Sequence, residues 1–153
     1  MIHINFNSLN KYSMKNDQLS IVRKIMEEGI GSADLSIIDQ HVSDSFIEHQ
    51  FAANGGKEGL KKTITQLYRG LFNFQYVLQN SSLDGDTAWT HYKATAIQSG
   101  TFMNMPPSTN HISIDIIDIF RFENELLVEH WGIPDRFAAM MQLGVFNKKE
   151  PVS

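Results

Sequence analysis

The sequence predicts a single α+β domain in which a cone-shaped, curved antiparallel sheet wraps around N-terminal helices, an architecture often called an α+β barrel. Three segments with apolar residues at helical spacing come first, and long strands follow one another after them. The length of 153 residues suits one domain that buries roughly two thirds of its unfolded surface.

Composition excludes several classes of function. The net charge of −4 is dispersed, and no cluster of Lys and Arg is dense enough for a phosphate backbone, so nucleic acid is not an expected partner. Cysteine is absent, which excludes disulfides and a thiolate nucleophile. No apolar run approaches the roughly 20 residues of a membrane span, and the N-terminus has no apolar signal region. We therefore expect a cytoplasmic protein with no membrane contact.

The expected domain covers residues 15–146. Met14 precedes a clearer helix start than Met1 does, so residues 1–14 are expected to be an appendage, either an arm or an extra edge strand. Residues 147–153 are polar and are expected to form a C-terminal tail.

Three helices are expected in the first half of the chain. Apolar residues recur every three or four positions in each, and residues typical of caps and stops flank them. The expected helices run from Asn16 or Asp17 to Gly29, from Ser32 or Asp34 to Val42, and from Lys57 to Gly70, the last with an apolar stripe that reaches Leu71.

Strands are expected where the apolar pattern changes to alternation. A proline-containing loop over residues 102–108 is typical either of a cavity cover or of a plain crossover. Pro134 is expected to open a last helix that ends before Gly144. The expected strands are Phe46–Gln50, a strand that begins at Phe74, Thr87–Gln98, and a hairpin of residues 112–122 and 126–132.

The hairpin holds the clearest chemical signal. A three-residue loop centred on Asn124-Glu125 would oppose Arg121 to Glu129 as an outward ion pair and would put Asp118 and His130 together on the inner face. The apolar residues of that face are Ile116, Phe120, Phe122 and Val128. A strict two-residue turn would instead put Asp118 on the side of Trp131. We favour the first register because it sorts charged residues outward.

An acid and an imidazole on one apolar wall can exchange protons near neutral pH. Burial raises the pKa of a carboxyl group, and a neighbouring histidine lowers it again. Proton transfer in catalysis needs such a pair. The alternative interpretation is that Asp118 binds a backbone N–H and that His130 is a hydrogen-bonded core histidine.

Four segments carry a family resemblance: FIEHQ, GGKEGL, DTAWTHYK and DIFRFENELLVEHW. From about Lys15 to Gly144 the chain resembles the SnoaL-like branch of the nuclear transport factor 2-like superfamily. The resemblance implies one deep pocket and a homodimer formed through the outer sheet face. Some relatives are polyketide cyclases that close a ring by intramolecular aldol condensation, with a pocket acid and with neither metal nor cofactor.

The resemblance also implies site residues. His49 and His91 match histidines of the first and middle strands, Asp118 matches the acid of the hairpin, and His130 with Trp131 matches the HW pair. In the common pattern an acid follows this pair, whereas this chain has Gly132. The acid/base role would therefore pass to Asp118 with His130.

Three functions remain open from the sequence. The first is a cofactor-independent lyase or isomerase that enolises a carbonyl compound, with Asp118, His130, His49 and His91 as catalytic residues. The second is a module that binds a small hydrophobic molecule without turnover. The third is a metal site of the same four residues, which lack a chelating spacing such as His-x-x-x-His. The expected substrate-binding residues are Phe120, Trp131, Trp89, Phe122, Ile116 and Asp135, and the expected homodimer contacts include Ile117, Ile119 and Trp131.

Overall fold

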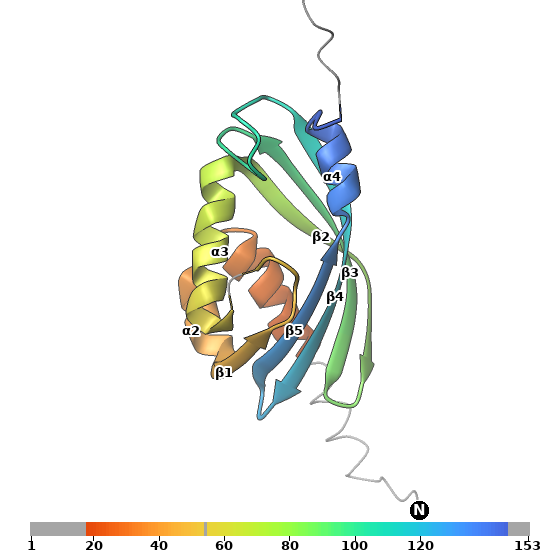
Figure 1. Ribbon diagram of the computed structural model, residues 1–153. Helices are drawn as coiled ribbons and strands as arrows, with labels where there is room; N and C mark the ends of the chain where they lie inside the picture. Colours follow the sequence, from red (N-terminus) through yellow and green to blue (C-terminus); the bar gives the residue numbers. More distant parts are fainter. Residues whose placement is uncertain (1–17, 54, 147–153) are drawn as a thin grey trace, which may run out of the picture.

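The structure, a computed structural model, describes residues 18–53 and 55–146 and is built on a curved five-stranded sheet (Figure 1). The strand order is β1-β5-β4-β3-β2. All neighbours are antiparallel except β1, which runs parallel to β5, so the sheet is mixed. The α+β prediction is confirmed. The strands are β1 Val42–Glu48, β2 Leu71–Asp84, β3 Thr87–Gln98, β4 His111–Glu123 and β5 Leu126–Pro134.

Helices cover the concave side of the sheet, and one more helix packs at its end (Figure 1). Residues 18–23 are α-helical and continue directly into a wider π-helical segment, η1. The remaining elements are η1 Lys24–Ile30, α2 Leu35–His41, α3 Gly56–Gly70 and α4 Arg136–Gln142. Within the described ranges, no helix combines the length and apolarity needed to cross a membrane. The predicted appendage 1–14 and tail 147–153 lie outside these ranges.

Two element boundaries differ from the sequence prediction for a local reason. Pro134 is the last residue of β5, where it pairs with Ile116, and Asp135 donates its N–H to Asp115. Asp135 then accepts a hydrogen bond from the N–H of Ala138 and caps α4. The prediction that Pro134 opens the helix is wrong because the sheet ladder continues past it.

Strands are also longer than the apolar pattern indicated. Leu71 starts β2 by pairing with Gln98 and is not part of the preceding helix. Val42 begins β1 directly after α2, and β1 ends at Glu48. These strands contain polar and exposed stretches, so their extent depends on pairing and not on local alternation.

The hairpin register is confirmed, although it arises in an unexpected way. Arg121 lies opposite Glu129 and donates Nε–H to Glu129 Oε1 at 2.7 Å. The turn itself has only two residues, Asn124 and Glu125, both with positive φ. A bulge next to Phe122 supplies the extra residue that restores the predicted register.

The core fills the cone between helices and sheet. Its largest fully buried side chains include Tyr92, Phe120 and Phe122 from the sheet. From the helices, Ile25, Ile38 and Ile64 join the same apolar cluster. A second, smaller cluster around Leu71 and Leu143 closes the end of the sheet where α4 packs. The space left between these clusters is the candidate site.

Candidate functional site

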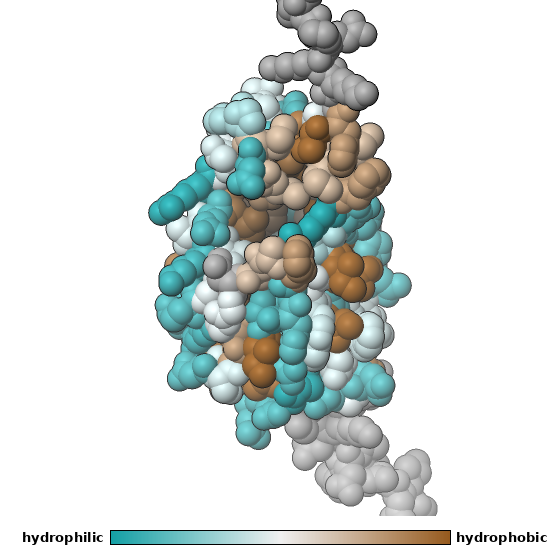
Figure 2. All heavy atoms as spheres, in the orientation of Figure 1, coloured by the Kyte–Doolittle hydropathy of each residue, from teal (hydrophilic) through white to brown (hydrophobic). Residues whose placement is uncertain are grey.

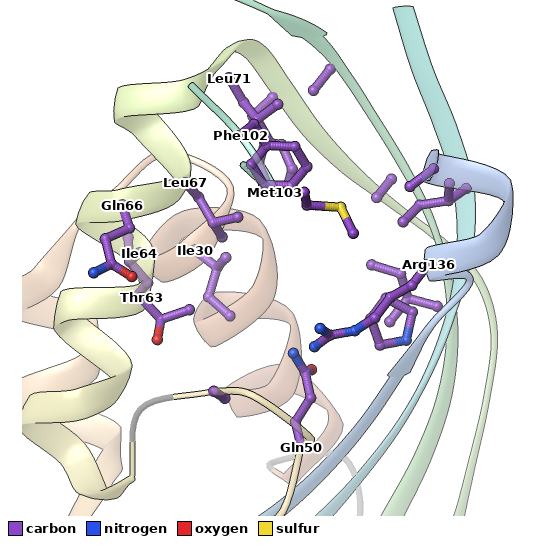
Figure 3. Close-up of a pocket in the computed structure, with 18 of the residues that line it drawn as sticks. Ile30, Gln50, Thr63, Ile64, Gln66, Leu67, Leu71, Phe102, Met103 and Arg136 are labelled. Atoms are coloured by element: carbon purple, nitrogen blue, oxygen red, sulfur yellow. The ribbon is translucent and has the colours of Figure 1, made fainter. Parts of the chain in front are cut away.

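A cavity of about 850 Å³ opens between the concave face of the sheet and the helices. Figure 3 draws Ile30, Ile64, Leu67 and Leu71 on its helical side. The sheet supplies the facing wall, in which Ile116 lies beside Asp118 and His130. A largely apolar cavity with a few convergent polar groups is the usual form of a small-molecule site.

The loop after β3 forms one side of the cavity. Phe102, Met103 and Asn104 line it, which supports the interpretation of this loop as a cavity cover. The buried side chain of Gln98 holds this loop in place through hydrogen bonds. The Gln98 amide donates to the carbonyl of Pro106 at 2.8 Å and accepts from the hydroxyl of Ser108. This side of the cavity is therefore held by specific hydrogen bonds.

The polar centre of the cavity is a row of three side chains. His130 Nε2 is hydrogen-bonded to Asp118 Oδ1 at 3.1 Å. Its other ring nitrogen, Nδ1, joins Glu48 Oε2 at 2.8 Å. Asp118 is 2% exposed and the side chain of Glu48 is 4% exposed. The sequence prediction that Asp118 and His130 meet on the inner face is confirmed.

The two carboxylates keep the imidazole protonated. Burial by itself lowers the pKa of His130, but the hydrogen bonds to Asp118 and Glu48 outweigh it and raise this pKa to about 9. At neutral pH the ring is an imidazolium that donates one hydrogen bond to each carboxylate. His130 therefore has no free lone pair with which to act as a base.

Asp118 retains one free oxygen. Its Oδ1 atom accepts from His130, whereas Oδ2 is buried and has no hydrogen-bond partner in the described part of the chain. A buried carboxylate oxygen that receives no hydrogen bond carries an uncompensated desolvation cost, and it is available to accept a proton. Glu48 has no such free oxygen, because Oε1 accepts the backbone N–H of Gln50 at 2.7 Å.

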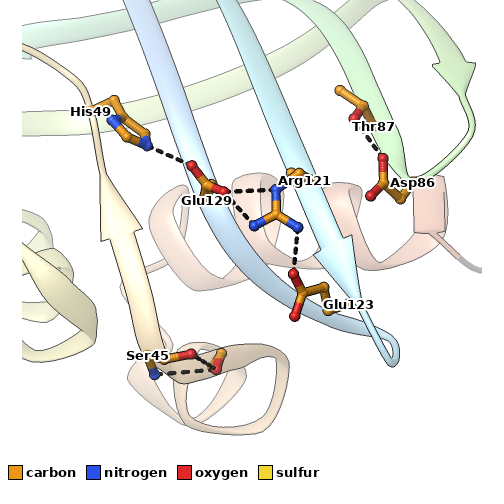
Figure 4. A network of polar contacts seen from close by, with 8 residues as sticks. Ser45, His49, Asp86, Thr87, Arg121, Glu123 and Glu129 are labelled. Atoms are coloured by element: carbon orange, nitrogen blue, oxygen red, sulfur yellow. Dashed lines mark hydrogen bonds and ion pairs between the residues drawn. The ribbon is translucent and has the colours of Figure 1, made fainter.

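His49 and His91 do not reach the cavity, and the prediction that they converge with Asp118 and His130 is wrong. His49 bonds Glu129 at 2.8 Å on the outer face, as Figure 4 shows, and stacks on Trp131. His91 bonds Asp115 on the same face. His91 alternates with the inward residues of β3, and His49, just beyond β1, follows the inward-facing Glu48 and points to the other side.

The predicted substrate-binding residues divide into three groups. Ile116 lines the cavity. Phe120 and Phe122 are core residues, and Phe120 stacks on the His130 ring with 4.9 Å between centroids. The other three lie away from the cavity: Trp89 and Trp131 are on the outer sheet face, and Asp135 caps α4. Their predicted contact with substrate in this cavity is wrong, because Trp89 and Trp131 alternate with the inward residues of their strands and the Asp135 side chain is held as the cap of α4.

The polar residues of the cavity that the sequence analysis missed include Glu48, Gln50 and Arg136. A signal for the first was present, because Phe46 and Glu48 alternate on one face of β1 and Phe46 is buried. Gln50 continues the same alternation just beyond the strand. No local pattern indicated Arg136, which faces the cavity from the start of α4 (Figure 3).

Gly132 makes room for Gln50. A Cβ atom at position 132 would overlap Gln50 Oε1, and would lie 2.9 Å from His130 Cε1 and 3.1 Å from Asp118 Oδ1. The place in which an acid at position 132 would begin is therefore filled by the Gln50 amide. Substitution here would force the flexible end of Gln50 to move.

Apolar side chains gather over α4 on the face shown in Figure 2, whereas α3 presents a mostly hydrophilic surface. Phe51, Phe137 and Phe146 are exposed in this region. Asp118, His130, Glu48 and Gln50 form one polar cluster in the wall of the cavity. In the described ranges, no three acidic or histidine side chains are arranged to hold a metal ion.

Comparison with known proteins agrees with this geometry. The family model of the SnoaL-like polyketide cyclases matches residues 20–143. No curated protein matches the chain. Among solved structures, a protein from Jannaschia sp. CCS1 described as a SnoaL-like polyketide cyclase is 20% identical, with a TM-score of 0.78 over 84% of this chain and 92% of that one.

Two further structures come from Streptomyces. IdmH of Streptomyces antibioticus, described as a polyketide cyclase, is 20% identical, with a TM-score of 0.74 over 83% of this chain and 98% of that one. AclR of Streptomyces galilaeus, described as a hydroxylase, is 18% identical, with a TM-score of 0.76 over 86% and 98%. At these identities the structures share a fold with the chain. Because the family model spans most of the sequence, the chain belongs to the SnoaL-like polyketide cyclase family.

Proposed function

We propose that the protein is a cofactor-independent enzyme that enolises a carbonyl compound in the cavity, by the kind of chemistry that a polyketide cyclase performs. The observation that carries the proposal is the buried row Glu48–His130–Asp118 in an apolar wall, with Asp118 Oδ2 free of hydrogen bonds. A general base needs a free acceptor atom and a fixed orientation. Asp118 has both.

Each member of the row has its own role in this proposal. Asp118 accepts the proton through Oδ2. His130, held as an imidazolium, orients Asp118 through Oδ1 and balances its charge. Glu48 fixes the ring from the other side and helps to keep it protonated. The arrangement differs from the sequence-based scheme, in which His130 could also remove the proton, because its pKa is too high.

The proposed reaction is the closure of a ring within one substrate molecule. Asp118 removes a proton from the carbon next to a carbonyl group, and the electrons of the broken C–H bond move onto the carbonyl oxygen to give an enolate. The enolate carbon then attacks a second carbonyl carbon of the same molecule and forms a C–C bond. The resulting alkoxide takes the proton back from Asp118. No oxidant, reductant or metal is consumed.

The cavity supports a small, mostly apolar substrate. Its volume of about 850 Å³ and its aliphatic and aromatic lining suit a molecule with several rings or a folded chain. The hydrogen-bonded pair Asp118 and His130 lies at one part of the wall. We therefore infer that the substrate carries its reactive carbonyl at one end and buries the remainder against the helices and the loop.

The proposal is tested by proton exchange. A panel of cyclic and linear 1,3-diketones is incubated with the protein in deuterium oxide, and α-deuteration is followed by NMR. Replacing Asp118 by Asn should slow exchange about a hundredfold or more, the usual loss when a general base is removed. Asp115→Asn is the matched control, because Asp115 is also bonded to a histidine but lies on the outer face.

A binding module is the alternative, and the near-complete burial of Asp118 favours it. In that case ligands would bind to the purified protein and leave unchanged. Equal exchange rates for the native protein, Asp118→Asn and Asp115→Asn would refute the enzymatic role and leave binding as the function.

We also propose a homodimer formed through the outer face of the sheet. Trp89, Ile117 and Ile133 are exposed there, and paired strands place them side by side. An apolar patch of this kind is seldom left to water. The ion pairs around it, such as that of Asp115 with Lys93, would form a polar rim.

A further inference from the structure

Two hydrogen-bond donors face the cavity beside the row Glu48–His130–Asp118, and they have no role in the reaction proposed above. Gln50 and Arg136 both line the cavity. Figure 3 draws the Gln50 amide and the Arg136 guanidinium pointing toward one another, with the amide nitrogen of Gln50 directed into the cavity. They lie far apart in the sequence, and only the fold brings both to this cavity.

Gln50 is held with its nitrogen available. Its Oε1 atom lies over Gly132, in space that any side chain at position 132 would occupy. Its backbone N–H is fixed by Glu48, the outer member of the row Glu48–His130–Asp118. The amide therefore sits beside both Asp118 and His130, since the same Cβ position at 132 is 3.1 Å from Asp118 Oδ1 and 2.9 Å from His130 Cε1.

Arg136 is anchored but not neutralised. One of its terminal nitrogens, Nη2, donates to the carbonyl of Phe51 at 2.6 Å, which ties it to the residue next to Gln50. Within residues 18–53 and 55–146, no carboxylate forms an ion pair with it. Its charge and remaining N–H groups are free for a ligand.

We propose that Gln50 and Arg136 bind the carbonyl oxygen of the substrate and stabilise the negative charge that forms on it when Asp118 removes the proton. The inference rests on the proposed function. Fixed donors aimed at developing charge contribute most in a cavity that excludes water. The class of substrate follows: a compound whose enolate oxygen reaches this pair while its α-carbon faces Asp118.

Gly132 then leaves the space in which the Gln50 amide lies. An alanine at this position would overlap the Gln50 amide oxygen and displace this flexible side chain, and it would also lie 2.9 Å from His130 Cε1, so the ring would have to shift slightly. The glycine at position 132 and the amide at position 50 therefore depend on each other: the Gln50 amide fills the space beside Asp118 and His130 that a side chain at position 132 would occupy.

The test uses an enolate mimic, 4-nitrophenolate, and its uncharged counterpart 4-nitrotoluene. Binding is measured at pH 8 in the Asp118→Asn background, in which the asparagine represents the protonated carboxyl group of the enolate complex. The phenolate should bind at least tenfold more tightly than nitrotoluene, by the usual strength of hydrogen bonds to a charged group. Gln50→Leu, Arg136→Met and Gly132→Ala should each reduce this preference about tenfold or more.

Gln75→Leu is the control, because Gln75 is exposed on β2 and does not line the cavity. It should leave the preference unchanged. The proposal is overturned if the phenolate has no preference over nitrotoluene, or if the preference survives in both Gln50→Leu and Gly132→Ala. Circular dichroism of each variant separates a loss of donors from a loss of fold.

Proton exchange distinguishes this inference from the function on which it rests. Gln50→Leu, with Asp118 intact, should slow α-deuteration about a hundredfold through kcat, as removal of an oxyanion donor does. If Asp118→Asn abolishes exchange and Gln50→Leu does not slow it, the enzymatic function stands and the donor pair is refuted. If phenolate preference depends on Gln50 but no diketone exchanges, the donor pair stands and enolisation is refuted.

Discussion

The charge state of His130 makes the stability of the protein depend on pH in a defined direction. The pKa of this side chain is raised from 6.5 to about 9 in the folded protein, because two carboxylates accept its hydrogen bonds and outweigh the effect of burial. Each unit of pKa difference corresponds to about 1.4 kcal/mol. Protonated His130 therefore contributes roughly 3 kcal/mol to the free energy of unfolding.

The sign follows from proton binding in the two states. Below pH 6.5 both states hold the proton and the full contribution is present. Above pH 6.5 the unfolded chain loses the proton first, so stability falls with rising pH until the folded protein also loses it near pH 9. The slope should approach, but not exceed, about 1.4 kcal/mol per pH unit.

Two measurements check this prediction. The free energy of unfolding in urea is determined from pH 6 to pH 9.5, and the ring protons of His130 are titrated by NMR over the same range. Among the described residues, the range from pH 6.5 to 9.5 is clear of other groups with shifted pKa values: burial lowers the pKa of His41 below 6.5, and burial raises the pKa values of Tyr76 and Tyr92 above 10. A midpoint near 6.5 for His130 would refute the reasoning.

A substitution provides the control. His130→Gln removes the titrating group and should flatten the pH dependence between pH 6.5 and 9. At pH 6.5 this variant should also be less stable by about 3–5 kcal/mol, because Asp118 and Glu48 remain buried without their cation. His91→Gln, which alters an outer-face histidine, should retain the pH dependence of the native protein. If the His130→Gln variant retained the slope, another group would be its source.

Three other changes have expected outcomes. Phe122→Ala should lower the free energy of unfolding by about 3–5 kcal/mol, since the ring is fully buried in the core; urea unfolding measures it. Trp89→Lys should convert the proposed dimer to a monomer in sedimentation experiments, and a native protein that sediments at 17.4 kDa would contradict the dimer. Gly132→Asp should add a third carboxylate near Asp118 and His130, raise one carboxyl pKa, and make stability fall as the pH rises above about 4, as unfolding between pH 4 and 7 would reveal.

Local patterns in the sequence determined the elements and the central pair. Helical spacing predicted α2 and α3, alternation predicted β3 and the hairpin, and the sorting of Arg121 and Glu129 outward predicted that Asp118 and His130 share the inner face. These features follow from side-chain periodicity and the hydrophobic effect, which act within a few residues of each other. The family assignment followed from the same segments and is confirmed.

The tertiary structure decided which other residues join that pair. Glu48 meets His130 because β1 lies parallel to β5, a pairing between segments 82 residues apart that no local pattern specifies. For the same reason Gln50 approaches Gly132, and Arg136 bonds the carbonyl of Phe51. His49 and His91, which the sequence favoured, face outward because adjacent residues of a strand point to opposite sides. Residue type alone therefore indicated the chemistry, and only long-range strand pairing decided which side chains could take part in it.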